Sequence, residues 1–143
     1  MSLRFVPSLL LVITLGYSIS APAESELSIN ELMVQVITPA TNTLWGADDP
    51  QTAAAWKILA EAAGKTHAAA IKTRQGGVLS DGNNPSGEPE WENLADQMVK
   101  AAVLAQKAIR AKDFDALLDA GNELYTPCEA CHQIYHSGVK GNL

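Results

Sequence analysis

The sequence predicts an all-α protein, folded as an antiparallel up-down-up-down four-helix bundle. Four segments repeat apolar residues at i, i+3, i+4 and i+7, which is the period of an amphipathic helix. Two short links and one longer loop join these segments, and almost no stretch shows the alternation of a β-strand. Short links favour antiparallel neighbours, so we expect the helices to run alternately up and down.

The first predicted helix covers about residues 28–45. Ser28 and Glu31 have the spacing of a capping box at its start, and Gly46 marks its end. Pro39 lacks the N–H that would bond to the carbonyl of Gln35, so we expect a kink there. The apolar stripe of this helix comprises Ile29, Leu32, Met33, Val36, Ile37, Ala40 and Leu44.

The second predicted helix is rich in alanine and runs to about Arg74. We expect it to begin at Asp49 and Pro50, which have the pattern of a cap followed by a first-turn proline. Its inner face is centred on Leu59, Ala63, Thr66 and Ala70. Residues 75–88 are rich in Gly, Ser, Asn and Pro, and this composition predicts the one long loop.

The third helix is predicted from about Pro89 to Ala111, and the fourth from a cap at Asp113 to near His136. A second start signal at Thr126 and Pro127 predicts that the fourth helix is kinked or restarted there. The stripe of the third helix comprises Trp91, Leu94, Ala95, Met98, Ala102, Ala105 and Ile109. The stripe of the fourth comprises Phe114, Leu117, Leu118, Gly121, Leu124, Tyr125, Cys128, His132 and Tyr135.

Residues 1–23 have the pattern of a secretory signal peptide. Arg4 lies in a short head without acidic residues, an apolar run follows, and Ala21-Pro22-Ala23 is an A-x-A cleavage site. The apolar run is too short for a membrane-spanning helix, and no other segment is apolar enough to be one. We therefore expect an exported chain, residues 24–143, that forms one domain of 143 − 23 = 120 residues.

The exported chain is acidic. Cleavage removes only Arg4 from the charged residues, so 9 basic and 16 acidic residues remain, a net charge of 9 − 16 = −7. This charge disfavours a polyanion such as nucleic acid as a partner. The charge favours a partner with a basic docking face, through steering of the encounter. A surface that is acidic only for solubility explains the composition equally well.

Cys128-Glu129-Ala130-Cys131-His132 is a C-x-x-C-H motif, the attachment pattern of a covalent haem c. Cys128 and Cys131 would bond the haem vinyl groups, and His132 would be an axial ligand of the iron. These are the only cysteines of the chain. A thioredoxin-like pair would follow a strand, and a zinc site would need a second ligand pair, and the sequence shows neither.

With this motif and four helices, the chain resembles the cytochrome c′-like (class II) family of c-type cytochromes. A tyrosine, Tyr135, follows the motif near the end of the last helix. The resemblance implies one covalent haem c near the C-terminus of the fourth helix, a periplasmic location, and electron transfer rather than enzymatic activity. Homodimers are common in the family. His136 is a departure, because relatives usually carry Arg or Lys there.

Met33 is the candidate for the second axial position. It lies about five residues into the first helix, and His132 lies about four residues before the end of the fourth, so their depths in the bundle agree within roughly 2 Å. In the related proteins a methionine of the first helix is the sixth ligand of low-spin members, whereas five-coordinate members bind NO or CO. The sequence therefore predicts a one-electron carrier with His/Met ligation, and a gas-binding protein is the alternative. Met33 as core filler also stays open.

Other candidate ligands fit the sequence pattern less well. His67 lies on the flank of the inner face of the second helix, and His136 lies on the same side of its helix as His132. Met98 is expected in the core, beyond the depth of the iron. We expect Trp45, Trp56 and Phe114 at the end of the bundle away from the haem, Trp91 at the haem end, and Tyr125 and Tyr135 as packing residues whose hydroxyls reach polar partners.

Overall fold

The computed structural model describes residues 27–136, and within that range the only regular elements are helices. The predicted all-α class is confirmed. The predicted signal peptide, residues 1–23, and its cleavage site lie outside the described residues. The elements are α1 (Ile29–Leu32), the π-helical turn η1 (Met33–Ile37), α2 (Thr38–Trp45), α3 (Ala53–Gln75), α4 (Pro89–Ala111) and α5 (Phe114–Tyr135).

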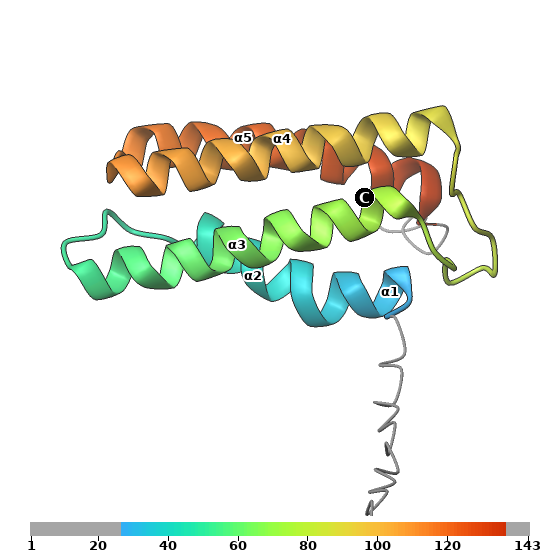
Figure 1. The fold of residues 1–143 in the computed structure, drawn as a ribbon, viewed down its shortest axis with the longest axis horizontal. Coiled ribbons are helices and arrows are strands. Elements are labelled where there is room, and N and C mark those ends of the chain that lie inside the picture. Colours follow the sequence, from blue (N-terminus) through green and yellow to red (C-terminus); the bar gives the residue numbers. More distant parts are fainter. Residues whose placement is uncertain (1–26, 137–143) are drawn as a thin grey trace, which may run out of the picture.

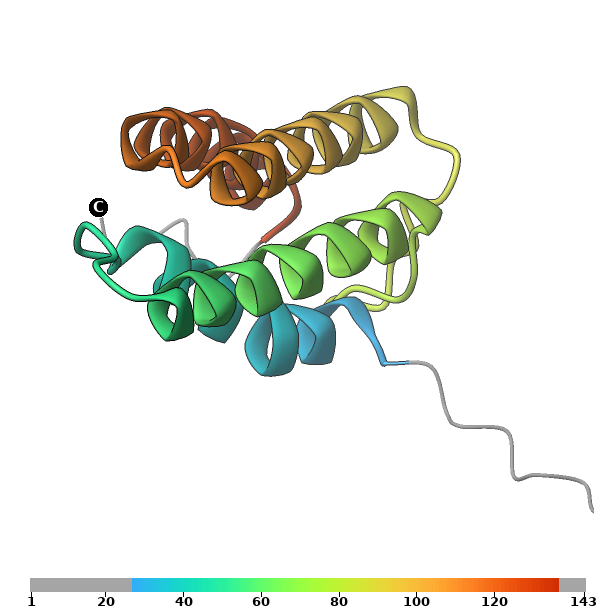
Figure 2. The ribbon, with the colours of Figure 1, turned by 60° about the vertical axis from the view of Figure 1, so that its left-hand side comes forward.

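The helices form an antiparallel bundle of four. α1, η1 and α2 follow one another without a break and are together called the first helix. Figure 1 shows α4 and α5 side by side in one layer and α3 with the first helix in the other, and consecutive helices run in opposite directions. Figure 2 shows the same two layers from the side, with the link from α3 to α4 crossing at one end. The predicted up-down-up-down arrangement is therefore seen.

Helix boundaries follow the predicted signals with two exceptions, one at the start of α3 and one within α5. α4 begins at Pro89 and ends at Ala111, as expected, and the carboxylate of Asp113 accepts from the N–H of Ala116 to cap α5. The prediction that Asp49 and Pro50 begin the second helix is wrong. The cap is Thr52, whose hydroxyl oxygen accepts from the N–H of Ala55, while Pro50 is buried in the link before it.

The first helix is irregular at the predicted place, but the irregularity is a π-turn. Ser28 and Glu31 form the expected capping box, with the N–H of Ser28 donating to the Glu31 carboxylate at 2.9 Å. Further along, the N–H of Thr38 donates to the carbonyl of Met33, five residues back, instead of the usual four. This wider turn lies directly before Pro39, which is the second residue of α2.

α5 continues through Pro127 as one helix, so of the predicted kink or restart at Thr126 and Pro127 the restart is wrong. The buried line of α5 runs through Leu117, Ala120, Leu124, Pro127 and Cys131. Three residues predicted on this face lie beside it instead, since Leu118, Tyr125 and His132 are exposed. The core face is therefore narrower than the predicted stripe.

The core comprises three apolar clusters along the bundle. The far cluster holds Trp56 and Leu117, with Phe114 packed against it, as predicted for these aromatic residues. The middle cluster joins Leu32, Ile37, Met98 and Leu124, and the third, at the C-terminal end of α5, joins Ile29, Trp91, Leu94 and Cys131. Buried alanines such as Ala70 and Ala102 occupy the contact between α3 and α4, where small side chains let helix axes approach closely.

None of the helices within residues 27–136 combines the length and the apolar run that crossing a bilayer requires.

Candidate functional site

The C-x-x-C-H motif occupies the last turns of α5. Cys131 is buried and Cys128 is half-buried, while His132 is exposed. Residues three and four apart on a helix share a face, so Cys128 lies on the same side of α5 as Cys131 and His132. The structure therefore directs both thiols and the imidazole to one side of the helix end.

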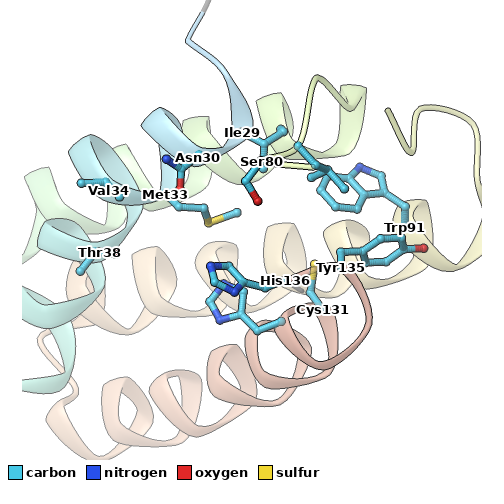
Figure 3. Close-up of a pocket in the computed structure, with 12 residues that line it drawn as sticks. Ile29, Asn30, Met33, Val34, Thr38, Ser80, Trp91, Cys131, Tyr135 and His136 are labelled. Atoms are coloured by element: carbon cyan, nitrogen blue, oxygen red, sulfur yellow. The ribbon is translucent and has the colours of Figure 1, made fainter. Parts of the chain in front are cut away.

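This side of α5 faces a cleft of about 230 Å³, called the outer cleft. Met33 lines it from the first helix, opposite Cys131 and His132, as the equal depths in the sequence predicted. In Figure 3 the thioether of Met33 points across the cleft toward His136 and Cys131. The remaining lining residues are Ile29, Asn30, Val34, Thr38, Leu79, Ser80, Trp91 and Tyr135.

The outer cleft exists because the first helix and α5 diverge. No Cα atom of α1 or η1 comes within 8 Å of a Cα atom of α5, whereas α2 does approach α5. At the close end, the indole Nε1–H of Trp45 donates to the backbone carbonyl of Gly121 at 3.1 Å. The bundle is thus closed at the end of α2 and open beside Met33.

A second, smaller hollow of about 120 Å³ continues the outer cleft toward the middle of the bundle. The inner hollow shares Met33, Thr38, Cys131 and His132 with the outer cleft and is also lined by Cys128. Two predictions are corrected here, because Trp45 and Met98 also line this hollow. Trp45 folds onto α5 instead of joining the far cluster, and buried Met98 lies level with the cysteines instead of beyond them.

Trp91 forms the end wall of the outer cleft, as predicted. It is 1% exposed, and its Nε1–H donates to the carbonyl of Thr73 at 2.7 Å. Its ring meets that of Tyr135 edge to face, with centroids 5.0 Å apart, and the Tyr135 hydroxyl donates to Glu88. Tyr135 thus reaches a polar partner as expected, whereas Tyr125 packs its exposed ring against Trp45.

Burial sets the protonation of the motif. The pKa of His132 is lowered by partial desolvation of the ring, although the residue is exposed as a whole, and the nearby His136 lowers that pKa further, which favours the neutral imidazole at neutral pH. Burial raises the pKa of Cys128 to about 11, and burial with the charge of Cys128 raises that of Cys131 to about 11. Partial burial and the contact with Glu88 raise the pKa of Tyr135 to about 12, which keeps its hydroxyl a donor.

The other two histidines occupy different places. His67 is half-buried on α3 and lines neither the outer cleft nor the inner hollow. His136 lines the outer cleft beside His132, and the two ring centroids are 5.7 Å apart. Because His136 follows His132 by one turn of the same wall, it does not face the imidazole from across the cleft as Met33 does.

Part of the lining was missed by the sequence patterns. Leu79 and Ser80 come from the loop after α3, which folds back so that the carbonyl of Val78 accepts from the N–H of Ile29. Loop residues follow no period, so no signal placed them. Asn30 and Val34 could have been found, because Asn30 lies three residues before Met33 and Val34 lies four residues after Asn30 on the helix.

Comparison of the chain with protein-family models, with curated proteins and with solved structures gave no match. A function proposed for this protein therefore rests on its own residues and geometry.

Proposed function

We propose that this protein is an exported mono-haem c-type cytochrome that carries one electron at a time. In this proposal Cys128 and Cys131 would hold one covalent haem c, and the side chains of His132 and Met33 would ligate its iron. One observation carries the proposal: the C-x-x-C-H end of α5 and Met33 of the first helix line the same apolar cleft from opposite sides. The first helix and α5 diverge beside this motif, and the planar haem would lie in the space between them.

The residues of the outer cleft fit such a group in their chemistry. Its walls are mainly apolar, with Ile29, Leu79 and Trp91 around the lining sulfur and imidazole groups. Thioether and neutral imidazole are the axial ligands that cytochromes c use, and this pair raises the reduction potential. The lowered pKa of His132 supports this role, because only a neutral imidazole can offer a lone pair to a metal.

Each residue of the site would have a separate task. The thioethers formed by Cys128 and Cys131 would fix the haem to α5, and His132 would ligate the iron from the same helix. Met33 would approach from the opposite wall, and Trp91 would exclude water at the end of the cleft. The haem supplies a one-electron couple between ferric and ferrous iron, so the protein needs only to bind, orient and shield it.

A dithiol redox function is disfavoured by the state of the two thiols. Reactive cysteines of C-x-x-C enzymes have lowered pKa values, which make the thiolate available near neutral pH. Here burial raises the pKa of Cys128 and of Cys131 to about 11. Thiols of this kind are poor nucleophiles at neutral pH, which favours a structural role such as attachment of a cofactor.

The distribution of charge supports a cationic redox partner. Residues 27–52 and 113–136, which include the two helices that line the outer cleft, contain no Lys or Arg. Every Lys and Arg of the described chain lies within 53–112, on α3, on α4 or directly after α4. The side of the molecule that carries the cleft is therefore acidic, with Glu31, Asp115, Asp119, Glu123 and Glu129 on its helices. A partner with a basic docking face would be steered to this side.

Export to the bacterial periplasm completes the proposal. It is supported by the signal-peptide pattern of residues 1–23, with Arg4 before the apolar run. The absence of any further cysteine in the chain agrees with a motif reserved for one haem.

A five-coordinate gas-binding protein is the second candidate. Val34 and Ile29 stand beside Met33 on the same wall, so apolar side chains would cover the iron if the thioether did not reach it. This arrangement would leave an open position for NO or CO.

Optical and paramagnetic-resonance spectra of the purified holoprotein distinguish the two candidates. We expect low-spin iron in both oxidation states and no change of the ferrous spectrum under carbon monoxide. High-spin ferric iron together with rapid uptake of carbon monoxide would reject His/Met ligation and support the gas-binding candidate. A protein without haem absorption would reject both.

A further inference from the structure

The π-turn η1 changes the rotation of the first helix at the residue proposed as iron ligand. Met33 is the first residue of the turn, and its carbonyl accepts from the N–H of Thr38. A π-turn contains one residue more than an α-turn, so the two parts of the helix differ in rotation by about 100° from a regular helix. Such turns occur often at functional sites.

The burial pattern of the first helix matches this extra residue. A buried stripe normally advances by three or four residues, but Leu32 is followed by Ile37, five residues later. In a regular helix Val36 would take the buried place after Leu32, yet Val36 is only half-buried. The π-turn thus keeps Ile29 and Leu32 in the same core as Ile37 and Leu44.

The wall of the cleft shows the same shift. Asn30 and Val34 line the outer cleft, Thr38 lines both hollows, and Asn42 lines the inner hollow. These residues are spaced by four, and in a regular helix each step of four moves the line about 40° around the axis. Three such steps would turn Asn42 about 120° away from Asn30. The extra residue of η1 removes about 100° of this drift, so the wall stays continuous.

Pro39 accounts for the position of the π-turn. Its ring would clash with the carbonyl of Gln35 in a regular helix, and it has no N–H to offer to that carbonyl. The wider turn before it relieves the clash and moves the hydrogen bond of Thr38 to Met33. Pro39 is exposed on the first helix, so no packing demand on its ring explains a proline there.

We infer that Pro39 is a positioning residue for Met33: it enforces η1, and η1 sets the rotation at which the Met33 thioether faces Cys131 and His132. In Figure 3 the thioether points across the cleft toward Cys131 and His136, and His132 lines the cleft as well. The inference rests on the proposed function, in which Met33 ligates the haem iron. It adds a residue outside the cleft lining to the set that controls the ligand.

Pro39→Ala in the full holoprotein tests the inference. The new backbone N–H at this position can donate to the carbonyl of Gln35, so the turn becomes regular and the segment from Ile29 to Met33 rotates by about 100° relative to α2. Ferric iron should then become mainly high-spin, and ferrous iron should bind carbon monoxide. The variant Pro39→Ala with Gln35 deleted is the matched control, since it removes both the proline and the extra residue. It should restore the low-spin spectrum.

A second readout follows the backbone directly. Hydrogen-bond couplings in the nuclear magnetic resonance spectrum of the ferrous protein identify which carbonyl accepts from Thr38. Wild-type protein should show Met33 as the acceptor, Pro39→Ala should show Val34, and contacts from the Met33 methyl group to Cys131 should be lost in this variant.

The outcomes separate this inference from the proposed function. If the N–H of Thr38 still donates to Met33 in Pro39→Ala, Pro39 does not enforce the π-turn and does not position Met33. If that hydrogen bond changes but the iron stays low-spin and the methyl contacts persist, Pro39 does not position Met33 either. If the wild-type protein is already five-coordinate, ligation by Met33 is rejected, while the backbone bond and the methyl contacts still decide whether Pro39 directs the side chain.

Discussion

Trp45 joins the first helix to α5 through Gly121, 76 residues later in the chain, with a 3.1 Å hydrogen bond from the indole to the backbone carbonyl. Gly121 leaves room for this approach, because a Cβ atom there would lie 3.3 Å from Cδ1 of Trp45. The indole also meets the ring of Tyr125 edge to face, at a centroid distance of 6.3 Å. This contact closes the bundle just before the two helices diverge around the cleft.

Trp45→Ala should destabilise the protein by about 2–4 kcal/mol. The estimate combines about 1 kcal/mol for the hydrogen bond, about 0.5–1.5 kcal/mol for the aromatic pair, and part of the transfer free energy of the indole, which is 42% exposed and therefore more than half buried. Urea unfolding followed by circular dichroism measures this loss. Trp45→Phe should lose mainly the hydrogen bond, about 1 kcal/mol. Equal stability of all three proteins would show that the contact does not hold α2 on α5.

Met33→Ala should open the iron site without unfolding the bundle. The variant should shift ferric iron toward high spin, lower the reduction potential and let carbon monoxide bind, because a thioether opposite imidazole stabilises ferrous iron. Met98→Ala is the control, since Met98 is also a methionine of the inner hollow but is 2% exposed in the core. It should cost about 2–5 kcal/mol of stability and leave the spectrum low-spin. An unchanged spectrum of Met33→Ala would make Met33 a core residue only.

The thiols of haem-free protein should react slowly with iodoacetamide at pH 8. Burial raises the pKa of Cys128 and Cys131 to about 11, so almost no thiolate is present. Raised pKa values also make stability depend on pH: the unfolded chain releases these protons near pH 9, before the folded protein does. Stability of the haem-free protein should therefore fall as pH rises from about 9 to 11. If the folded protein is alkylated at pH 8 as fast as the chain unfolded in urea, the pKa values of the two thiols are not raised by burial.

Electron exchange with small cationic oxidants should slow as salt rises. The screening length falls from about 30 Å at 0.01 M to about 10 Å at 0.1 M, which weakens attraction to the acidic side of the molecule. Stopped-flow rates with hexaammineruthenium(III) should therefore decrease over this range, and rates with hexacyanoferrate(III) should increase. Glu129→Lys, beside the cleft, should reduce the salt effect more than Glu61→Lys on α3, although both change the net charge equally. Identical salt effects in the two variants would mean that only net charge matters.

The parts of the fold that local signals determine could be predicted from the sequence. Pro89 at the start of α4 and Asp113 before α5 mark boundaries through rules of single helices, and both are seen. Helix length and antiparallel order alone place Met33 opposite His132. At the start of α3 the signal of Asp49 and Pro50 competes with a second capping residue, Thr52. The hydroxyl of Thr52 caps α3, and Pro50 is buried in the link before it.

The parts that depend on contacts between helices could not be predicted. Pro39 predicts a kink, but the irregularity is a π-turn, and the accompanying entry of Leu32 and Ile37 into one core is a contact between helices. The far-end position expected for Trp45 is wrong, because a sequence pattern does not show that its side chain turns back onto Gly121. Leu79 and Ser80 reach the cleft through the path of a loop, which no periodicity encodes.

Mass spectrometry of the protein from the periplasm of cells with a working cytochrome-maturation system tests the central claim most directly. We predict a chain that begins at Glu24 and carries the mass of one haem, bound through the only two thiols, Cys128 and Cys131. Replacement of both cysteines by alanine should abolish the added mass. A wild-type chain with the mass of its residues alone would contradict the account, whatever the shape of the cleft.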